Sequence, residues 1–410
     1  MQLSALAMSS GIAAQAPPWT EASGLPLPHD VRSVRILRWE EPLLNEPRGS
    51  APRRGTAGKS ALLPLYGAQR GPGCEHRWLM VGPSAWVCGD HTEYSTAPPL
   101  AARSRPHLFS NGMPFAYYFV AEDGSLGYEQ LSLAEEQAPD EELEPGFAVA
   151  IRQIAKKNGG QKFGLSTKGL WIPMRDLRMA RPYGFEGIGK DRLAGVGWIK
   201  SASGTIFKKP GGRRSSQRPL KKHSAVLVIE KSSHRSKDWY RVGQDRWLRA
   251  RDLRVPRPAT APPEARPGER WIDVDTETQI VTAYEGSEAV FSTLTSTGRG
   301  AKDSELATPK GTHRIWVKLQ TSDMTNLQDD KASRFYAMQE VPWVMFFKGG
   351  YGLHAAFWHR NFGNRQSHGC VNLAPKDAQR LFHFTRPALP AGWKAALPTQ
   401  YDPGTLIVVR

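Results

Sequence analysis

A short pattern of aromatic and small residues occurs twice in the chain at identical spacing. Residues 78–87 and 239–248 both place Trp at the first position, Val-Gly four residues into the segment and a second Trp eight residues after the first. Phe163 and Trp171, between these segments, are also eight residues apart. Apolar runs on both sides of a tight Gly-containing turn are typical of a β-hairpin. The repetition predicts a reused β unit, and therefore a chain built from small β modules.

Each of the two later hairpins is preceded by an apolar strand-like run, at residues 147–151 and 225–229. We therefore expect three modules, at residues 29–105, 106–190 and 191–256. These units resemble bacterial SH3-like domains, and the resemblance implies binding to, or orientation on, cell-wall peptide. We interpret the tryptophans as barrel core in preference to a ligand platform, because large aromatic side chains dominate the cores of small domains.

The hairpin of the first module is flanked by Cys74 and Cys88. Cysteines on both sides of a hairpin can come within bridging distance, so we predict a disulfide between them. Such a bond indicates an oxidising, extracytoplasmic compartment; two separate thiols in a cytosolic protein are the alternative. The pairing leaves Cys370, the third cysteine, as a free thiol.

The chain has 410 residues and a formal charge of +16. No helix-turn-helix, zinc-finger or RNA-recognition pattern organises this charge, so we expect no nucleic-acid partner and consider an anionic cell envelope compatible. Residues 1–28 are expected to be a leader, with Ala14-Gln15-Ala16 as a candidate signal-peptidase site. No apolar run reaches the roughly 18 residues of a transmembrane helix.

Two further segments have the composition of a loop or a linker. Residues 208–222 are rich in Lys, Arg, Gly and Ser and are predicted to be a mobile basic loop. Residues 257–268 contain several prolines and are predicted to be a stiff linker. The remaining region, residues 269–410, is expected to be a separate catalytic domain.

Strand patterns dominate this last region. Alternating apolar and polar residues predict a hairpin from 271–275 and 279–284. Three further strands are also predicted. One helix is predicted after Cys370, at residues 375–384. The pattern favours a mostly β catalytic sandwich, so the whole chain is expected to be mainly β. The further strands are 289–294, 315–319 and 405–409.

The candidate chemistry lies near the C-terminus. Cys370 follows His368 with only Gly369 between them, and His354 lies sixteen residues upstream of the cysteine. A thiol becomes a strong nucleophile as the thiolate, so a reactive cysteine needs a base or a positive field, and both histidines are candidates. The backbone N–H groups of residues 368–370 could form an oxyanion hole, because Gly369 permits close approach of a substrate.

The same residues resemble the signature of the L,D-transpeptidases, the YkuD or ErfK family. The match includes His354 and the run Ser-His-Gly-Cys-Val-Asn at residues 367–372. Residues 308–311 resemble the Thr-Pro-x-Gly turn of the family, and residues 341–354 resemble its approach to the first histidine. The resemblance covers residues 269–410 and implies a β-sandwich fold.

The resemblance also implies a reaction. The substrate would be the stem peptide of peptidoglycan, cleaved between its third-position diamino acid and D-alanine. Cys370 would attack this carbonyl with His354 as general base, oriented by the backbone carbonyl of Ala355. A thioester would form, and an amine of a second stem would resolve it into a 3→3 crosslink, with carbapenems as inhibitors. Ser367 and Asn372 are supporting residues of the same motif.

Other residues around the motif are candidates for shaping the cleft. His359, Trp343 and Tyr351 are predicted to form the substrate wall, with His359 also open to a structural role. Residues 322–341 are the candidate lid, because they lie between sheet strands and the motif. The resemblance places the protein in the periplasm or cell envelope, in cell-wall biogenesis and the control of cell shape.

Several alternatives stay open. Zinc could be bound by His354, His359, His368 and Cys370, but the His-Gly-Cys spacing is tight for one tetrahedral site and no known zinc frame is present. We therefore expect no metal and no cofactor. The same acyl-enzyme could be resolved by water or by an envelope protein, giving a carboxypeptidase, an endopeptidase or an attachment enzyme. A non-catalytic wall-binding protein is the third possibility, disfavoured by the intact motif.

Overall fold

The computed structural model describes residues 25–100, 109–157, 159–301, 304–328 and 335–410. The predicted leader falls almost wholly outside this part of the chain. The described residues are mainly β-strand, with a single α-helix, α1 (Pro375–Phe384), where the sequence predicted it. No helix within the described ranges is both long and apolar enough to cross a membrane. The chain divides into two compact units, which are described in turn.

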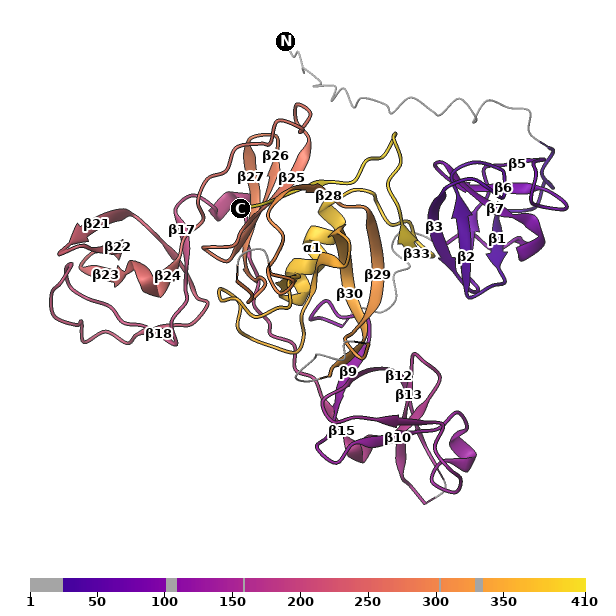
Figure 1. The fold of residues 1–410 in the computed structure, drawn as a ribbon, viewed down its shortest axis with the longest axis horizontal. Helices are drawn as coiled ribbons and strands as arrows, with labels where there is room; N and C mark the ends of the chain where they lie inside the picture. The colour runs from indigo at the N-terminus through magenta and orange to yellow at the C-terminus, as the bar shows by residue number, and fades with distance from the viewer. Residues whose placement is uncertain (1–24, 101–108, 158, 302–303, 329–334) are drawn as a thin grey trace, which may run out of the picture. The chain divides into compact units, whose positions relative to one another are not determined.

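The first unit contains the N-terminal module, drawn in indigo in Figure 1. Its predicted hairpin is present: Trp78 pairs with Cys88, and Met80 with Trp86, on two antiparallel strands. Cys74 and Cys88 are bonded as a disulfide beside the two tryptophans, which are buried. The strands are β1 (Ser33–Ile36), β2 (Glu40–Leu44), β3 (Arg53–Gly58), β4 (Leu62–Pro64), β5 (Gly67–Gln69), β6 (Trp78–Gly82), β7 (Ala85–Cys88) and β8 (Thr92–Ser95).

This first unit also includes two short C-terminal segments, Ala391–Trp393 and Pro398–Pro403. The buried guanidinium of Arg54 forms an ion pair with Asp402 at 2.8 Å and lies over the ring of Trp393. Both segments were expected to belong to the catalytic domain. They group instead with the N-terminal module, which they contact through Trp393 and Asp402.

The second unit repeats the predicted hairpin twice more. Phe163 pairs with Pro173 in one hairpin, and Arg241 pairs with Trp247 in the other. All three hairpins are followed directly by a one-turn 3-10 helix, at Gly89–His91, Met174–Asp176 and Ala250–Asp252. The internal repeat is therefore confirmed, whereas the likeness to SH3 domains stays a prediction.

The described residues of modules two and three form strands and 3-10 turns. The predicted mobile loop at residues 208–222 is partly ordered by the pairing of Ser203 with Lys221 and a bridge between Phe207 and Arg214. The strands of the second module are β9 (Ala116–Val120), β10 (Ser125–Gly127), β11 (Glu141–Leu143), β12 (Ala148–Lys156), β13 (Lys162–Ser166), β14 (Trp171–Pro173) and β15 (Leu177–Met179). Those that follow are β16 (Ile188–Gly189), β17 (Val196–Ile199), β18 (Ser203–Gly204), β19 (Leu220–Lys221), β20 (Ala225–Leu227), β21 (Glu230–His234), β22 (Lys237–Gly243), β23 (Arg246–Arg249) and β24 (Leu253–Arg254).

The C-terminal domain is a sandwich of two sheets, as the alternating sequence predicted. The predicted hairpin at its start and its last strand are confirmed, and the last strand runs parallel to the first. The strands are β25 (Arg270–Asp275), β26 (Ile280–Glu285), β27 (Glu288–Ser296), β28 (Gly311–Arg314), β29 (Val317–Thr325), β30 (Ala337–Lys348), β31 (Tyr351–Ala355), β32 (Val371–Leu373), β33 (Trp393–Ala396) and β34 (Leu406–Val409). One sheet contains β28, β34, β25, β26 and β27; the second continues from the end of β27 through β32, β31, β30 and β29.

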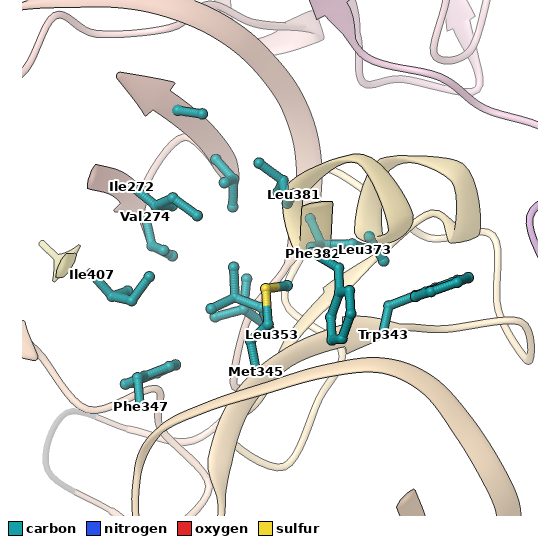
Figure 2. Packing of buried hydrophobic residues seen from close by; sticks show 14 of the residues in the cluster. Ile272, Val274, Trp343, Met345, Phe347, Leu353, Leu373, Leu381, Phe382 and Ile407 are labelled. Atoms are coloured by element: carbon teal, nitrogen blue, oxygen red, sulfur yellow. The ribbon is translucent and has the colours of Figure 1, made fainter. Parts of the chain in front are cut away.

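A single apolar core fills the space between the two sheets. Ile272, Val274 and Ile407 reach it from the first sheet, and Met345 and Leu353 from the second, as Figure 2 shows. Helix α1 closes one end of this core with Leu381 and Phe382. The strand that follows Cys370 and the strand that contains His354 therefore both pack into this core.

The segments between the modules are bound to the C-terminal domain. Ile188 pairs with Ser292, so that β16 extends the first sheet. The predicted linker is also held: the side chain of Arg257 forms ion pairs with the buried Asp275 at 2.6 Å and with Glu277. Charged side chains thus tie the segment predicted as a stiff linker to the sheet.

Candidate active site

Cys370 lies directly before β32, the strand between β31 and β27. In the parallel pairing of β31 with β32, His354 is the partner of Asn372. Because side chains alternate along a strand, residues 370 and 372 project from the same face. The fold therefore places the histidine on the face from which the cysteine projects, although sixteen residues of chain separate them.

The imidazole of His354 is fixed in one tautomer. Its Nδ1 lies 3.0 Å from the carbonyl oxygen of Ala355, and because a carbonyl only accepts, Nδ1 carries the proton. The ring is buried and stacks on Trp358 with a centroid separation of 5.7 Å. The lone pair of Nε2 is consequently available to take a proton, as a general base requires.

Burial keeps both reacting groups neutral. Desolvation lowers the pKa of His354 to about 4, and the hydrogen bond to Ala355 opposes it only in part. Desolvation also raises the pKa of the Cys370 thiol, and a hydrogen bond with the backbone N–H of Gly352 opposes this shift only in part. The sulfur lies 3.6 Å from the carbonyl oxygen of Gly350, a contact suited to a neutral S–H donor. Both shifts favour a neutral thiol and a neutral imidazole near pH 7.

The turn that leads into Cys370 is held by two hydroxyl groups. Ser367 accepts the N–H of Gly369 at 3.1 Å and donates to the carbonyl of Cys370. Thr308, from the predicted Thr-Pro-x-Gly turn, donates to the carbonyl of Gly369 at 2.7 Å and accepts the N–H of Gly298. The expected oxyanion role of the Gly369 N–H is thus corrected: Ser367 already occupies this donor, because its hydroxyl lies inside the turn.

His368 is not placed as a base by the structure. Its ring stacks on Tyr336, with centroids 5.6 Å apart and planes inclined by 15°. Burial, with a smaller contribution from the charge of Arg299, lowers the pKa of His368. Burial raises the pKa of Tyr336, and the nearby Cys370 raises it further. Sequence reasoning missed Tyr336, which lies within the candidate lid.

Residues 269–409 match the family model of YkuD, described as the L,D-transpeptidase catalytic domain. The matched range contains the whole motif and the sandwich just described. Residues 269–409 therefore form a YkuD domain.

Solved L,D-transpeptidase structures are similar to parts of the chain. A mutant enzyme of Enterococcus faecium is 22% identical, with 35% of this chain and 50% of that chain covered, at a TM-score of 0.26. One from Stackebrandtia nassauensis is 26% identical, with 36% and 57% covered, at 0.25. One from Mycobacterium smegmatis is 18% identical, with 57% and 89% covered, at 0.26. The chain thus spans half the length of the Enterococcus enzyme. No curated protein sequence matches the chain significantly.

The predicted substrate wall of the YkuD domain is only partly where the sequence placed it. Tyr351 lies against Gly369 and donates to the carbonyl of Glu305 at 2.9 Å, at the edge of the catalytic turn. Trp343 is instead 3% exposed, packs against Phe382 in the core and cannot contact a substrate. The prediction for Trp343 was wrong because residue 343 points between the sheets, together with its alternate neighbours on β30.

His359 is part of the internal support of the YkuD site. Its Nε2 lies 3.0 Å from the amide of Asn372, and its Nδ1 accepts the N–H of Asn361 at 3.2 Å. The ring packs on Phe362, and burial, with a contribution from His354, lowers its pKa to about 4. Both ring nitrogens are engaged, which fits the structural role and leaves neither free for a metal.

Ser296 was not singled out from the sequence, yet it lies in the same row of the sheet. It is the partner of Asn372 on β27, and its hydroxyl donates to the carbonyl of Asn361 at 3.0 Å. The neighbouring Thr295 donates to the carbonyl of Asn372. Three adjacent strands of the YkuD domain thus contribute Ser296, Asn372 and His354 to one polar row.

The described residues of the lid candidate include paired parts of β29 and β30. Its described base is bound by the second module: Tyr117 donates to the carbonyl of Glu340 at 2.5 Å, and Ala148 pairs with Met338. Phe357, in the loop after His354, packs on Tyr117 with ring centroids 4.3 Å apart. The second module therefore contacts both the hairpin and the loop that border the site.

The residues weighed as a zinc site do not gather as one. Within the described ranges, two clusters of possible metal ligands occur, both in the first module around Asp90. One includes Cys74 and Cys88, whose sulfurs are bonded to each other, and the other is exposed on the surface. Neither cluster contains His354 or Cys370.

Proposed function

We propose that this protein is a peptidoglycan L,D-transpeptidase that forms 3→3 crosslinks through a thioester on Cys370. The observation that supports this most directly is the tautomer of His354, whose Nε2 is left free by the hydrogen bond from Nδ1 to Ala355. The YkuD match over residues 269–409 supplies the substrate class. A neutral thiol beside a neutral imidazole is a competent starting state for general-base attack.

The first half-reaction removes D-alanine. As the sulfur of Cys370 bonds to the carbonyl carbon of the stem peptide, its proton passes to Nε2 of His354. Charge develops on the carbonyl oxygen, where the backbone N–H groups of His368 and Cys370 are the proposed donors. The C–N bond then breaks, and the imidazolium protonates the leaving amine. The products are a thioester and free D-alanine, with His354 neutral again.

The second half-reaction transfers the acyl group. An amine of a neighbouring stem peptide attacks the thioester and gives its proton to Nε2 of His354. The C–S bond breaks, the thiolate takes this proton, and the crosslink is released. Exclusion of water by the lid hairpin would favour the amine over hydrolysis. The disulfide of the first module supports an extracytoplasmic location, where this substrate is present.

The test is mass spectrometry of purified protein incubated with disaccharide-tetrapeptide. A transpeptidase yields a dimer joined through two third-position residues, together with free D-alanine. A carboxypeptidase yields the tripeptide and D-alanine without dimer, and an attachment enzyme requires an added protein amine. Unchanged tetrapeptide, in the presence of a folded protein with a reduced Cys370, would contradict the proposal.

A further inference from the structure

The loop that connects His354 to Cys370 is held by side chains from outside the YkuD domain. Three consecutive residues of this loop are bound by the third module. Lys222 Nζ lies 3.4 Å from Oδ1 of Asn361. His223 Nε2 lies 2.8 Å from the carbonyl oxygen of Phe362, and Arg254 Nε donates to the carbonyl of Gly363 at 3.0 Å. We call these three side chains the module clamp.

His223 is the buried centre of the clamp. Because a carbonyl only accepts, Nε2 carries the proton, and Nδ1 accepts from the hydroxyl of Tyr183 at 3.0 Å. The ring lies edge-on to both Tyr183 and Phe185. Burial lowers its pKa to about 4, so the ring is neutral near pH 7 and keeps this tautomer. Each ring nitrogen thus has one partner, and the orientation of the ring is fixed.

The backbone at His223 is itself unusual. Its φ is +64°, in the left-handed region that a residue with a side chain adopts at an energetic cost. Such a conformation persists only where the surroundings over-determine it, and it is often found where a side chain must be placed for function. Here it directs the imidazole at the loop.

From the clamp, direct contacts lead to the catalytic strand. Phe362, whose carbonyl is bound by His223, packs on the ring of His359 with centroids 4.9 Å apart. His359 contacts the amide of Asn372, the residue two after Cys370 and the strand partner of His354. Asn361 joins the same chain through its N–H to Nδ1 of His359. A shift of the loop would therefore move the support of both reacting groups.

We propose that His223 is a positioning residue for the reaction of Cys370, acting through Phe362 and His359. This inference rests on the proposed function and deepens it: the third module becomes part of the catalytic apparatus. It follows that the reactivity of Cys370 depends on a histidine of another module that contacts neither the thiol nor the substrate. The sequence favours no such role, because His223 lies at the end of a basic segment with no motif around it.

The test uses the full chain with three substitutions: His223→Ala, His223→Gln and His234→Ala. Glutamine retains an N–H donor that can reach the carbonyl of Phe362, and His234 is an exposed histidine of the same module that serves as the matched control. The first readout is the pH dependence of Cys370 alkylation by iodoacetamide, since the other two cysteines are bonded. The second is the rate constant for acylation by a carbapenem, and the third is the urea unfolding midpoint.

We expect His223→Ala to shift the alkylation profile and to slow acylation by about 10-fold, because small displacements of reacting groups are costly. His223→Gln should restore most of the rate, and His234→Ala should match the wild type. A purely structural role would lower the unfolding midpoint yet leave the alkylation profile of the folded protein unchanged, which overturns the proposal. Equal rates in the Ala and Gln variants also overturn it.

Two further outcomes keep the test decisive. If His223→Ala does not fold, Arg254→Gln removes one clamp contact at a partly exposed position, and a wild-type alkylation profile in that variant overturns the proposal. If the wild-type protein forms no acyl-enzyme, the proposed function fails, whereas alkylation still shows whether the module clamp positions Cys370.

Discussion

The aromatic ring of Tyr351 covers the α-carbon of Gly369, so that a methyl group added there would lie 2.3 Å from a ring carbon. The φ of Gly369 is +121°, which residues with a side chain rarely adopt. Both the space and the conformation therefore require glycine at the centre of the Ser-His-Gly-Cys turn. The backbone N–H groups that we propose as oxyanion donors, those of His368 and Cys370, lie on its two sides.

Gly369→Ala should reduce the rate of Cys370 acylation by about 100-fold or more, because the turn must move to relieve the clash. The matched control is Gly349→Ala, in the turn between β30 and β31. Gly349 also has a positive φ, but nothing lies within 4 Å of an added methyl group. Stopped-flow acylation should separate the two, and equal losses in both variants would show that strain, not the contact with Tyr351, is responsible.

Cys370→Ala should abolish the carbapenem adduct, and His354→Ala should slow its formation by roughly 10²–10⁴-fold, the usual contribution of a general base. His359→Ala is expected to cost less, because this ring supports Asn372 and does not take the proton. Intact-mass spectrometry over time measures all three. An adduct on Cys370→Ala would assign the nucleophile elsewhere.

The rate of thiol alkylation should keep rising with pH beyond the usual cysteine range. Burial raises the pKa of the Cys370 thiol and lowers that of His354 to about 4, so neither group stabilises an ion pair at neutral pH. The thiolate fraction consequently grows only in the alkaline range. Iodoacetamide kinetics from pH 5 to 10 check this; a plateau already at pH 6 would indicate a preformed thiolate–imidazolium pair.

Local patterns predicted the framework of the fold, and tertiary contacts decided most of the rest. The hairpins and α1 were predictable because the spacing of apolar side chains that identifies each element lies within the element itself. His354 and Cys370 could be proposed from the sequence because the motif is contiguous around the cysteine. No local sequence motif marks Tyr336 or Ser296. Each is brought to the site by the pairing of strands in the sandwich.

Misplaced residues have equally physical reasons. Trp343 was predicted to line the substrate wall because it is near the motif in sequence. Its side chain instead points from β30 into the space between the sheets, where it is buried beside Phe382. The Gly369 N–H was expected to take part in an oxyanion hole, but it donates to the hydroxyl of Ser367. His223 could not be found at all from the sequence, because its partner Phe362 is 139 residues away.

The base of the lid hairpin offers a test of the second module. Tyr117→Phe removes the hydroxyl that donates to Glu340, and losing one such hydrogen bond costs about 1 kcal/mol. We expect a weaker apparent affinity for the stem peptide, with a smaller effect on the rate at saturation, because the hairpin borders the site without touching the thiol. Tyr118→Phe is the matched control, because Tyr118 is the next residue on β9 and its ring packs into the core of the second module. Identical kinetics in the two variants would contradict the anchoring role.

Acid should destabilise the folded chain through its buried histidines. His223, His354 and His359 each have a pKa of about 4 when folded, against roughly 6.5 when unfolded. Between these values the unfolded state binds more protons, so the free energy of unfolding falls as the pH drops from about 6.5 to 4. Asp377 acts in the opposite sense, because burial raises its pKa to about 7 and the folded state then binds the extra proton.

The contribution of Asp377 can be isolated by substitution. Its carboxyl accepts the N–H of Gly187 at 2.9 Å and the hydroxyl of Thr293, and an amide can keep the first contact without an ionisable proton. Relative to the wild type, Asp377→Asn should therefore gain stability as the pH rises from about 4 to 7, where the buried carboxyl of the wild type ionises at a cost. Urea midpoints at pH 5, 6, 7 and 8 measure this, with the exposed Asp123→Asn as control. A difference from the wild type that does not change with pH would mean that Asp377 ionises normally in the folded protein.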